Sequence, residues 1–174
     1  MAKSSNNKIR LDEQKVIDAL EQNSIDSIDK IAKCCGFSIQ KVSRIIKNLE
    51  RNKVIWGYPP ITDGELGGLK HFVLLIKKSL IPFDEVLKKE MILEKIDAYA
   101  PKSVKVENIL FTHGSYDVVV TFFALNLVNA KNFCGIAFKR LEKHIGEYIL
   151  LETLVPMRKQ GLKNPRIQEL IEYV

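Results

Sequence analysis

The sequence predicts an α+β protein in which a helical N-terminal domain precedes a larger domain of alternating strands and helices. Apolar residues recur at helical spacing between Ile28 and Leu49. From His71 onward, short β-prone runs alternate with helical segments. Between these parts, residues 59–68 begin with two prolines and end with two glycines, which is typical of a linker. The chain therefore divides into two domains of different secondary structure.

The composition is that of an ordinary globular protein with a basic N-terminal third. Of the 174 residues, 46% are hydrophobic and 28% are charged, so the composition indicates neither disorder nor a fibrous structure. The formal net charge is +6, and residues 1–60 hold 11 cations against 7 acids. Positive charge concentrated in one domain favours a nucleic-acid partner.

Two short helices joined by a tight turn are predicted between Ser27 and Lys53. The second helix has apolar residues at i, i+3, i+4 and i+7 from Val42 to Leu49. In the first helix, Ala32 is small enough for a close helix crossing, and Gly36 can take the positive φ that ends the helix. Ser38 can cap the second helix through its side-chain oxygen. This pattern predicts a helix-turn-helix motif.

The second of these helices presents a polar and basic face away from its apolar stripe. Between Ser38 and Lys53 there are five cations and one acid. An ordinary helical hairpin with a solvated basic face would show similar charges, but the spacing of Ala32 and Gly36 in register with the apolar stripe favours DNA binding. We expect Gln40 and Arg44 to face base edges, and the lysines to meet phosphates. The predicted DNA-binding residues are Ser38, Gln40, Lys41, Ser43, Arg44 and Lys47.

A third helix and a short strand are expected on either side of the motif. Residues 1–7 read as a frayed tail, followed by a helix from about Asp12, which can cap it, to Gln22. The run VIWGYPP after Lys53 is β-prone, and a strand there would form the small wing of a winged helix-turn-helix domain. We therefore expect a DNA-binding domain at 1–58, a hinge at 59–68, a second domain at 69–156 and a C-terminal extension at 157–174.

The second domain follows the order βαββαβ. Strands are predicted to begin at His71, Val104, Val118 and Tyr148, and helices to span 83–99 and 129–145. This order is the ferredoxin-like arrangement, in which two helices cover one face of a four-stranded antiparallel sheet. The other face would still carry large apolar residues, which favours a second subunit that packs its own sheet there.

The C-terminal extension predicts a short amphipathic helix. Asn164 can cap it, Pro165 can occupy its first position, and apolar residues follow at helical spacing from Ile167 to Val174. A frayed end is the alternative, because so short a helix is marginal alone.

Cofactors and membranes are not indicated. The three cysteines, Cys34, Cys35 and Cys134, are too few and wrongly spaced for a zinc site or a disulfide framework, so we expect no metal and no cofactor. No apolar run is long enough to span a membrane, and the N-terminus lacks the apolar core of a signal peptide. We therefore expect a cytoplasmic protein.

Together these features resemble the Lrp/AsnC (feast/famine) family of transcription regulators. The resemblance runs from Leu11 to about Pro156 and rests on the order and spacing of short pieces. These pieces are Leu11-Asp12, Gly36, Ser38, Leu49, Val54-Ile55, Gly57-Tyr58, Gly114 and Tyr116-Asp117. The resemblance implies a regulator that binds double-stranded DNA, dimerises through its C-terminal sheets and often assembles further into tetramers or octamers.

The sequence departs from the family pattern near both ends of the second helix of the motif. Ile39 stands where the family often has Pro, and either residue can begin a helix. Lys53 stands where a Gly commonly ends that helix, so Asn52 is expected to supply the positive φ. The predicted helix at 83–99 and the extension at 157–174 are also longer than the family pattern.

The resemblance further implies a small effector, commonly an amino acid, near the GSYD turn between the middle strands. From the residues alone, Gly114 can equally serve only a hairpin turn, and Asp117 can bond only nearby backbone amides. The Asp117 carboxylate is also suited to accept hydrogen bonds from a ligand ammonium group. The expected effector-binding residues are Thr112, His113, Gly114, Tyr116 and Asp117.

Enzymatic function is disfavoured. The histidines His71, His113 and His144 do not lie beside a serine or cysteine nucleophile at the spacing of a catalytic dyad, and no Gly-rich phosphate loop precedes a helix. One enzymatic alternative is a siroheme decarboxylase-like protein of similar architecture, which would need His and Arg around a large apolar pocket. A third alternative is an interaction module that has kept the fold and lost its DNA contacts.

Overall fold

The computed structural model describes residues 2–62, 67–92 and 100–173, and the chain forms two compact units, Met1–Ile61 and Thr62–Val174. Residues 93–99 of the predicted helix at 83–99 lie outside the described residues. Among the described residues, no helix combines the length and the apolar character that crossing a membrane requires.

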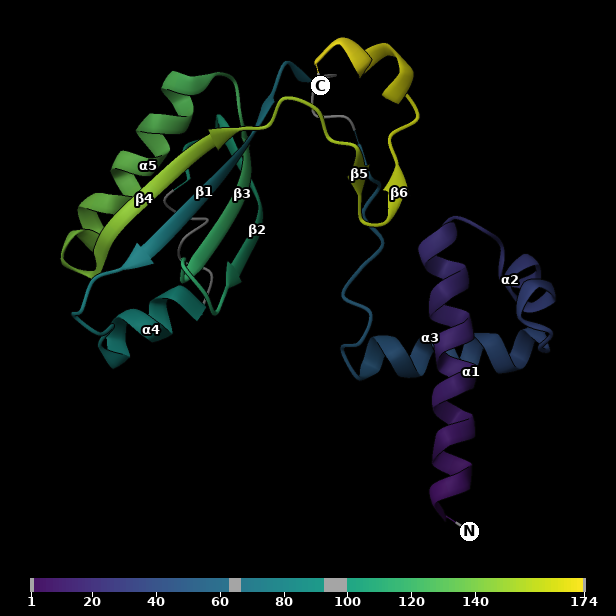
Figure 1. Cartoon of the computed structure of the whole chain (residues 1–174). Helices are drawn as coiled ribbons and strands as arrows, with labels where there is room; N and C mark the ends of the chain where they lie inside the picture. Colours follow the sequence, from purple (N-terminus) through teal and green to yellow (C-terminus); the bar gives the residue numbers. More distant parts are fainter. Residues whose placement is uncertain (1, 63–66, 93–99, 174) are drawn as a thin grey trace. The chain divides into compact units, whose positions relative to one another are not determined.

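Three helices make up the N-terminal unit: α1 (Ala2–Gln22), α2 (Ile28–Cys35) and α3 (Ile39–Arg51). Figure 1 shows α1 crossing α3 and continuing beyond it toward the N-terminus. The helices enclose one small core, made of Val16, Leu20, Ile31, Ala32, Val42, Ile45 and Leu49. The fold predicted for this part of the chain, a helix-turn-helix with a preceding helix, is confirmed.

The start of α1 corrects the prediction that residues 1–7 fray and that Asp12 caps the helix. The helix begins at Ala2, because residues 2–11 contain neither Pro nor Gly to interrupt it. Asp12 lies inside the helix, and its carboxylate pairs with the ammonium of Lys41 on α3 at 2.7 Å. The acid therefore joins two helices instead of capping one.

The predicted wing strand after α3 does not form. Residues 55–62 have no regular secondary structure, although Ile55 packs against the core of the N-terminal unit. Pro59 and Pro60 have no amide N–H to donate to a neighbouring strand, which discourages sheet pairing of this run. Two side chains hold the segment to the end of α3 and the turn after it: the Tyr58 hydroxyl donates to Glu50 of α3 at 2.9 Å, and the Trp56 indole donates to the carbonyl of Lys53 in the turn at 2.9 Å.

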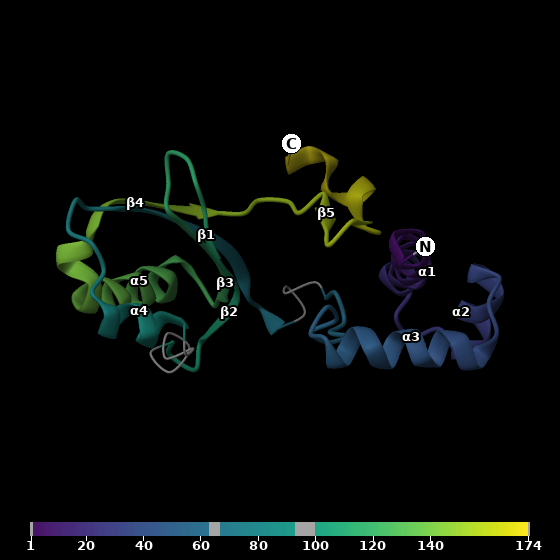
Figure 2. The same ribbon diagram turned by 90° about the horizontal axis from the view of Figure 1, so that it is seen from below.

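The C-terminal unit has the predicted βαββαβ order. Its elements are β1 (Lys70–Lys78), α4 (Glu85–Ile92), β2 (Val104–Phe111), β3 (Val118–Ala124), α5 (Leu127–Leu141) and β4 (Ile145–Glu152). The strands pair antiparallel in the spatial order β2-β3-β1-β4, and α4 and α5 cover one face of the sheet (Figure 2). The α+β fold class with a ferredoxin-like second domain is therefore confirmed.

The core of the C-terminal unit lies between the sheet and its helices. Phe72 and Phe122 are completely buried, and the Phe122 ring meets Phe133 of α5 with the ring centroids 4.9 Å apart. Alternation along β1 turns Val73 and Leu75 to the opposite face, where they are half-buried. The remaining apolar side chains of this open sheet face, which the helices leave uncovered, are Val119, Phe123, Ile149, Leu151 and Leu110.

The C-terminal extension folds differently from the prediction. It forms a hairpin of β5 (Arg158–Lys159) and β6 (Leu162–Lys163), followed by the 3-10 helix η4 (Ile167–Tyr173) in place of the expected α-helix. Asn164 does cap this segment, because its side-chain oxygen accepts from the Arg166 amide at 2.9 Å. The next amide, Ile167, bonds back to the Asn164 carbonyl, an i to i+3 bond that winds the chain more tightly than an α-helix.

Candidate nucleic-acid interface and effector turn

The helix-turn-helix is held by caps at the three points that set its geometry. The Ser27 and Ser38 side chains accept hydrogen bonds from the Lys30 and Lys41 amides, each at 3.3 Å, and so cap α2 and α3. Gly36 ends α2 with φ 69° and ψ 35°, the left-handed conformation expected there. The predicted caps at Gly36 and Ser38 are confirmed, and they fix how the chain enters α3.

The exposed face of α3 carries one polar and basic stripe. At about 100° per residue, Gln40, Arg44, Lys47 and Arg51 fall within roughly 60° of one another around the helix. All four are exposed, and the buried residues Val42, Ile45 and Leu49 lie on the opposite side. Ser43 is half-buried beside the stripe. The arrangement aims amide and guanidinium donors outward from a rigid, capped helix.

Lys41 differs from the other predicted DNA-binding residues, because its charge is engaged within the N-terminal unit. Its ammonium lies 2.7 Å from the Asp12 carboxylate and 3.7 Å from the centroid of the Phe37 ring. Both contacts draw the side chain toward α1 and the turn. Lys41 therefore braces α1 against the start of α3.

The C-terminal end of α3 corrects the prediction for Asn52. Asn52 has φ −83°, and Lys53 itself takes the left-handed conformation with φ 58°. The Lys53 amide bonds to the Glu50 carbonyl at 3.0 Å and the Val54 amide to the Leu49 carbonyl at 2.9 Å. These two bonds make the Schellman arrangement, which places the positive φ one residue after the cap, so it falls on Lys53.

The predicted effector residues come together in the connection between β2 and β3. The Thr112 amide donates to the Asp117 carbonyl at 2.8 Å, and the Thr112 hydroxyl donates to the Tyr116 carbonyl at 2.6 Å. Gly114 has φ 155°, and a Cβ added there would meet no atom within 4 Å. Its backbone conformation, and not lack of space, accounts for the glycine. His113 is exposed and Tyr116 is half-buried.

Asp117 is already bonded within the chain, on both carboxylate oxygens. One accepts from the Lys78 amide at 2.8 Å, and the other lies 3.3 Å from the Lys78 ammonium. The hydrogen bond from the Lys78 backbone amide is the main cause that holds the pKa of the Asp117 carboxyl below its usual value, and the Lys78 ammonium adds to it. In this structure the carboxylate ties the turn to the end of β1.

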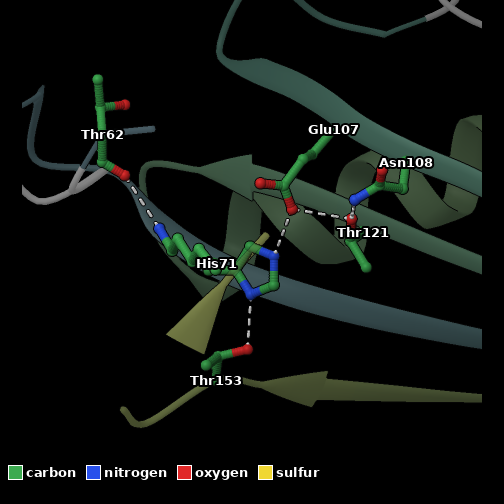
Figure 3. Close-up of polar contacts among 7 residues, drawn as sticks. Thr62, His71, Glu107, Asn108, Thr121 and Thr153 are labelled. Atoms are coloured by element: carbon green, nitrogen blue, oxygen red, sulfur yellow. Dashed lines mark hydrogen bonds and ion pairs between the residues drawn. The ribbon is translucent and has the colours of Figure 1, made fainter. Parts of the chain in front are cut away.

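A polar cluster on the open sheet face was not predicted. His71 Nε2 lies 3.1 Å from a Glu107 carboxylate oxygen and His71 Nδ1 2.6 Å from the Thr153 hydroxyl (Figure 3). The same Glu107 oxygen accepts from the Thr121 hydroxyl at 3.0 Å, which in turn accepts from the Asn108 amide at 2.8 Å. Alternation marks His71 and Thr121 as neighbours on one face, but the register shift that brings Glu107 to them, between Val106 and Asn108, has no clear sequence signal.

Metal ligation is not a feature of this cluster. Within the part of the chain that the structure describes, no three His, Cys, Asp or Glu side chains come together as metal ligands would. The cluster instead forms a satisfied polar network across neighbouring strands.

Solved structures of AsnC-type transcription regulators share the fold of this chain. An AsnC family transcriptional regulator from Agrobacterium tumefaciens superposes with a TM-score of 0.67 over 90% of this chain and 97% of its own, at 16% identity. The structure of E. coli AsnC gives a TM-score of 0.58 over 88% and 97% of the two chains, at 15% identity. The chain has the fold of the Lrp/AsnC regulators.

Two further comparisons bear on this Lrp/AsnC-like chain. An uncharacterized HTH-type transcriptional regulator, YugG of Bacillus subtilis (strain 168), is 27% identical over 127 residues, 70% of each protein. The Neisseria meningitidis transcriptional regulator NMB0573, solved as a complex with L-Met, matches 91% of this chain and 97% of its own with a TM-score of 0.63 and 13% identity. No protein-family model matches the chain.

Proposed function

We propose that this protein is a transcription regulator that binds specific DNA sequences through α3 and responds to a small effector such as an amino acid. The observation that carries the proposal is the exposed stripe of Gln40, Arg44, Lys47 and Arg51, set on a capped helix directly opposite its buried face. The likeness in sequence to an HTH-type transcriptional regulator and in fold to AsnC regulators supports it.

The N-terminal half of α3 enters the major groove in this proposal. Gln40 and Arg44 read base edges, because amide and guanidinium groups form paired hydrogen bonds there. Lys47 meets phosphates, because the side chains nearest the start of α3 reach deepest into the groove and Lys47 lies further along the helix. Ser38 and Ser43 lie beside this contact, and Lys41 acts mainly by holding α1.

Fluorescence anisotropy with a duplex target, measured over a range of salt concentrations, tests this assignment. Lys47→Ala is expected to weaken binding to all sequences alike and to lower the salt slope by about one charge. Arg44→Ala is expected to cost roughly 1 to 3 kcal/mol of specific binding and to relax sequence preference. If both variants lost specific and nonspecific binding equally, the division of roles would be wrong.

The assembly we propose is a dimer formed through the open sheet face. Val73, Leu75 and Ile149 are half-buried there, and Leu110 and Leu151 remain 51% and 47% exposed. An apolar sheet face of this kind is stabilised when a second sheet covers it, and two-fold symmetry lets one face cover another copy of itself. Light scattering at micromolar concentration is expected to give at least twice the mass of one chain; a stable monomer would contradict the proposal.

The effector site we propose is the turn of Thr112, His113, Gly114, Tyr116 and Asp117. The L-Met complex of the similar Neisseria regulator supports an amino acid as its chemical class. Calorimetric titration of amino acids into the wild type and His113→Ala and Asp117→Ala variants tests it. A ligand that bound all three proteins equally well would place the site elsewhere.

A further inference from the structure

The β5–β6 hairpin of the C-terminal extension concentrates positive charge in the C-terminal unit. Residues 157–166 contain four cations, Arg158, Lys159, Lys163 and Arg166, and no Asp or Glu. The rest of the chain from residue 61 onward holds 12 cations against 14 acids. The basic excess of this half of the protein therefore belongs to ten residues, which Figure 1 shows as a separate hairpin beyond β4.

The hairpin has a defined shape. Arg158 pairs with Lys163, and Lys159 pairs with Leu162, so a two-residue turn of Gln160 and Gly161 joins the strands. Both turn residues have positive φ, 47° and 83°, as in the type I′ turn that matches the twist of paired strands. The Arg158 guanidinium donates to the Gly161 carbonyl at 2.9 Å, which further fixes the turn.

The two faces of the hairpin have different roles. Lys159 attaches one face to the C-terminal unit: its ammonium donates to the Thr62 carbonyl at 3.1 Å and lies 5.2 Å from the centroid of the Phe123 ring. Arg158 and Lys163, the directly opposed pair, are both exposed on the other face. Like charges directly opposite each other on paired strands are destabilising. An anion between them would remove that repulsion.

We propose that Arg158 and Lys163 form a phosphate clamp that holds the DNA backbone, in addition to the contact made by α3. A guanidinium and an ammonium side by side recognise phosphate without regard to base sequence. This inference rests on the proposed function, because the duplex that α3 reads supplies the phosphates. Whatever the arrangement of the two units, the chain from Arg51 to Thr62, where the hairpin is attached, spans at most roughly 36 to 40 Å, about one turn of DNA. It spans less while Trp56 and Tyr58 keep their hydrogen bonds to Lys53 and Glu50.

The test measures DNA affinity of the full-length protein against salt concentration for a double variant, Arg158→Gln with Lys163→Gln. The matched control is Lys131→Gln with Lys139→Gln, which removes the same charge from exposed positions on α5. The hairpin variant is expected to lower the salt slope by about two charges with base preference unchanged. The control is expected to keep the wild-type slope, and so is the charge-retaining swap Arg158→Lys with Lys163→Arg.

The outcomes separate this inference from the proposed function. A wild-type slope in the hairpin variant, with Arg44→Ala still losing specific binding, would overturn the clamp and leave the regulator intact. A wild type without affinity for DNA would overturn both. If the hairpin variant kept its DNA slope and instead lost binding to vesicles of anionic phospholipid, the hairpin would be a lipid site and the inference would be wrong.

Discussion

Replacing Lys41 by Met tests whether this side chain serves the fold more than the DNA. Met keeps the apolar stem of the side chain and removes the ammonium that lies 2.7 Å from Asp12 and 3.7 Å from the Phe37 ring centroid. The lysine and aspartate side chains are 32% and 21% exposed, so solvent screens the pair and it contributes up to about 1 kcal/mol. The cation over the ring adds about 0.5 to 1 kcal/mol.

We therefore expect Lys41→Met to lower the free energy of unfolding of the N-terminal unit by about 0.5 to 2 kcal/mol. In a domain of this size that corresponds to a fall in melting temperature of about 2 to 16 °C. Urea unfolding followed by far-UV circular dichroism measures it, since α1, α2 and α3 hold most of the helix in the described part of the chain. The matched control, Lys47→Met, removes an exposed cation of the same helix and is expected to change stability little.

DNA titration of the same two variants completes the test. Lys47→Met is expected to lower the salt slope by about one charge, and Lys41→Met by clearly less. Unchanged stability in Lys41→Met together with a slope as low as that of Lys47→Met would refute the reasoning. Lys41 would then be a phosphate contact, as the sequence alone predicts.

Three further predictions concern the turns and the core. Lys53→Gly removes the strain of a lysine in the left-handed backbone conformation, φ 58°, and is expected to raise the free energy of unfolding in denaturant by about 0.5 to 1 kcal/mol. The control Asn52→Gly, at φ −83°, is expected to give no gain. The pKa of Asp117 is lower in the folded protein than the unfolded value near 3.8, so the ionised carboxylate stabilises the fold fully above that pH, and this stabilisation is lost as the pH falls through the folded pKa. Asp117→Asn is therefore expected to reduce the loss of stability on acidification. An unchanged loss of stability at low pH would argue against the hydrogen bond and ion pair with Lys78. Phe122→Ala is expected to cost about 3 to 5 kcal/mol in the same unfolding assay, because the ring is fully buried between Phe72 and Phe133; a loss below about 1 kcal/mol would contradict this packing.

The sequence predicts the parts of this fold that depend on local chemistry. Ser38 and Gly36 have side-chain and backbone properties that few other residues share, so their capping roles follow from position alone. The strands of the C-terminal unit follow from β-prone runs between turns, and their order then admits few topologies. The predicted outward side chains Gln40, Arg44 and Lys47 are exposed for the same reason, since helical period decides them.

The features that the sequence does not predict depend on partners far away in the chain. From the sequence, Lys41 is expected to be one more exposed cation of α3. In the structure, α1 places the Asp12 carboxylate beside its ammonium. Glu107 joins His71 only through the irregular register of β2 against β3, and such a bulge has no strong sequence signal. Asp117 suits a ligand ammonium equally well until Lys78 is seen to bond both carboxylate oxygens.

Selection of bound sites from a random duplex pool tests the central claim, sequence-specific DNA binding through α3, most directly. The wild type is expected to enrich one motif with two half-sites about 34 Å, or one turn of DNA, apart. Under the same conditions, Arg44→Ala is expected to enrich a motif with relaxed preference at the base pair that this side chain reads. A wild-type pool without any enriched motif would contradict the claim, and so would an Arg44→Ala pool with the wild-type motif unchanged.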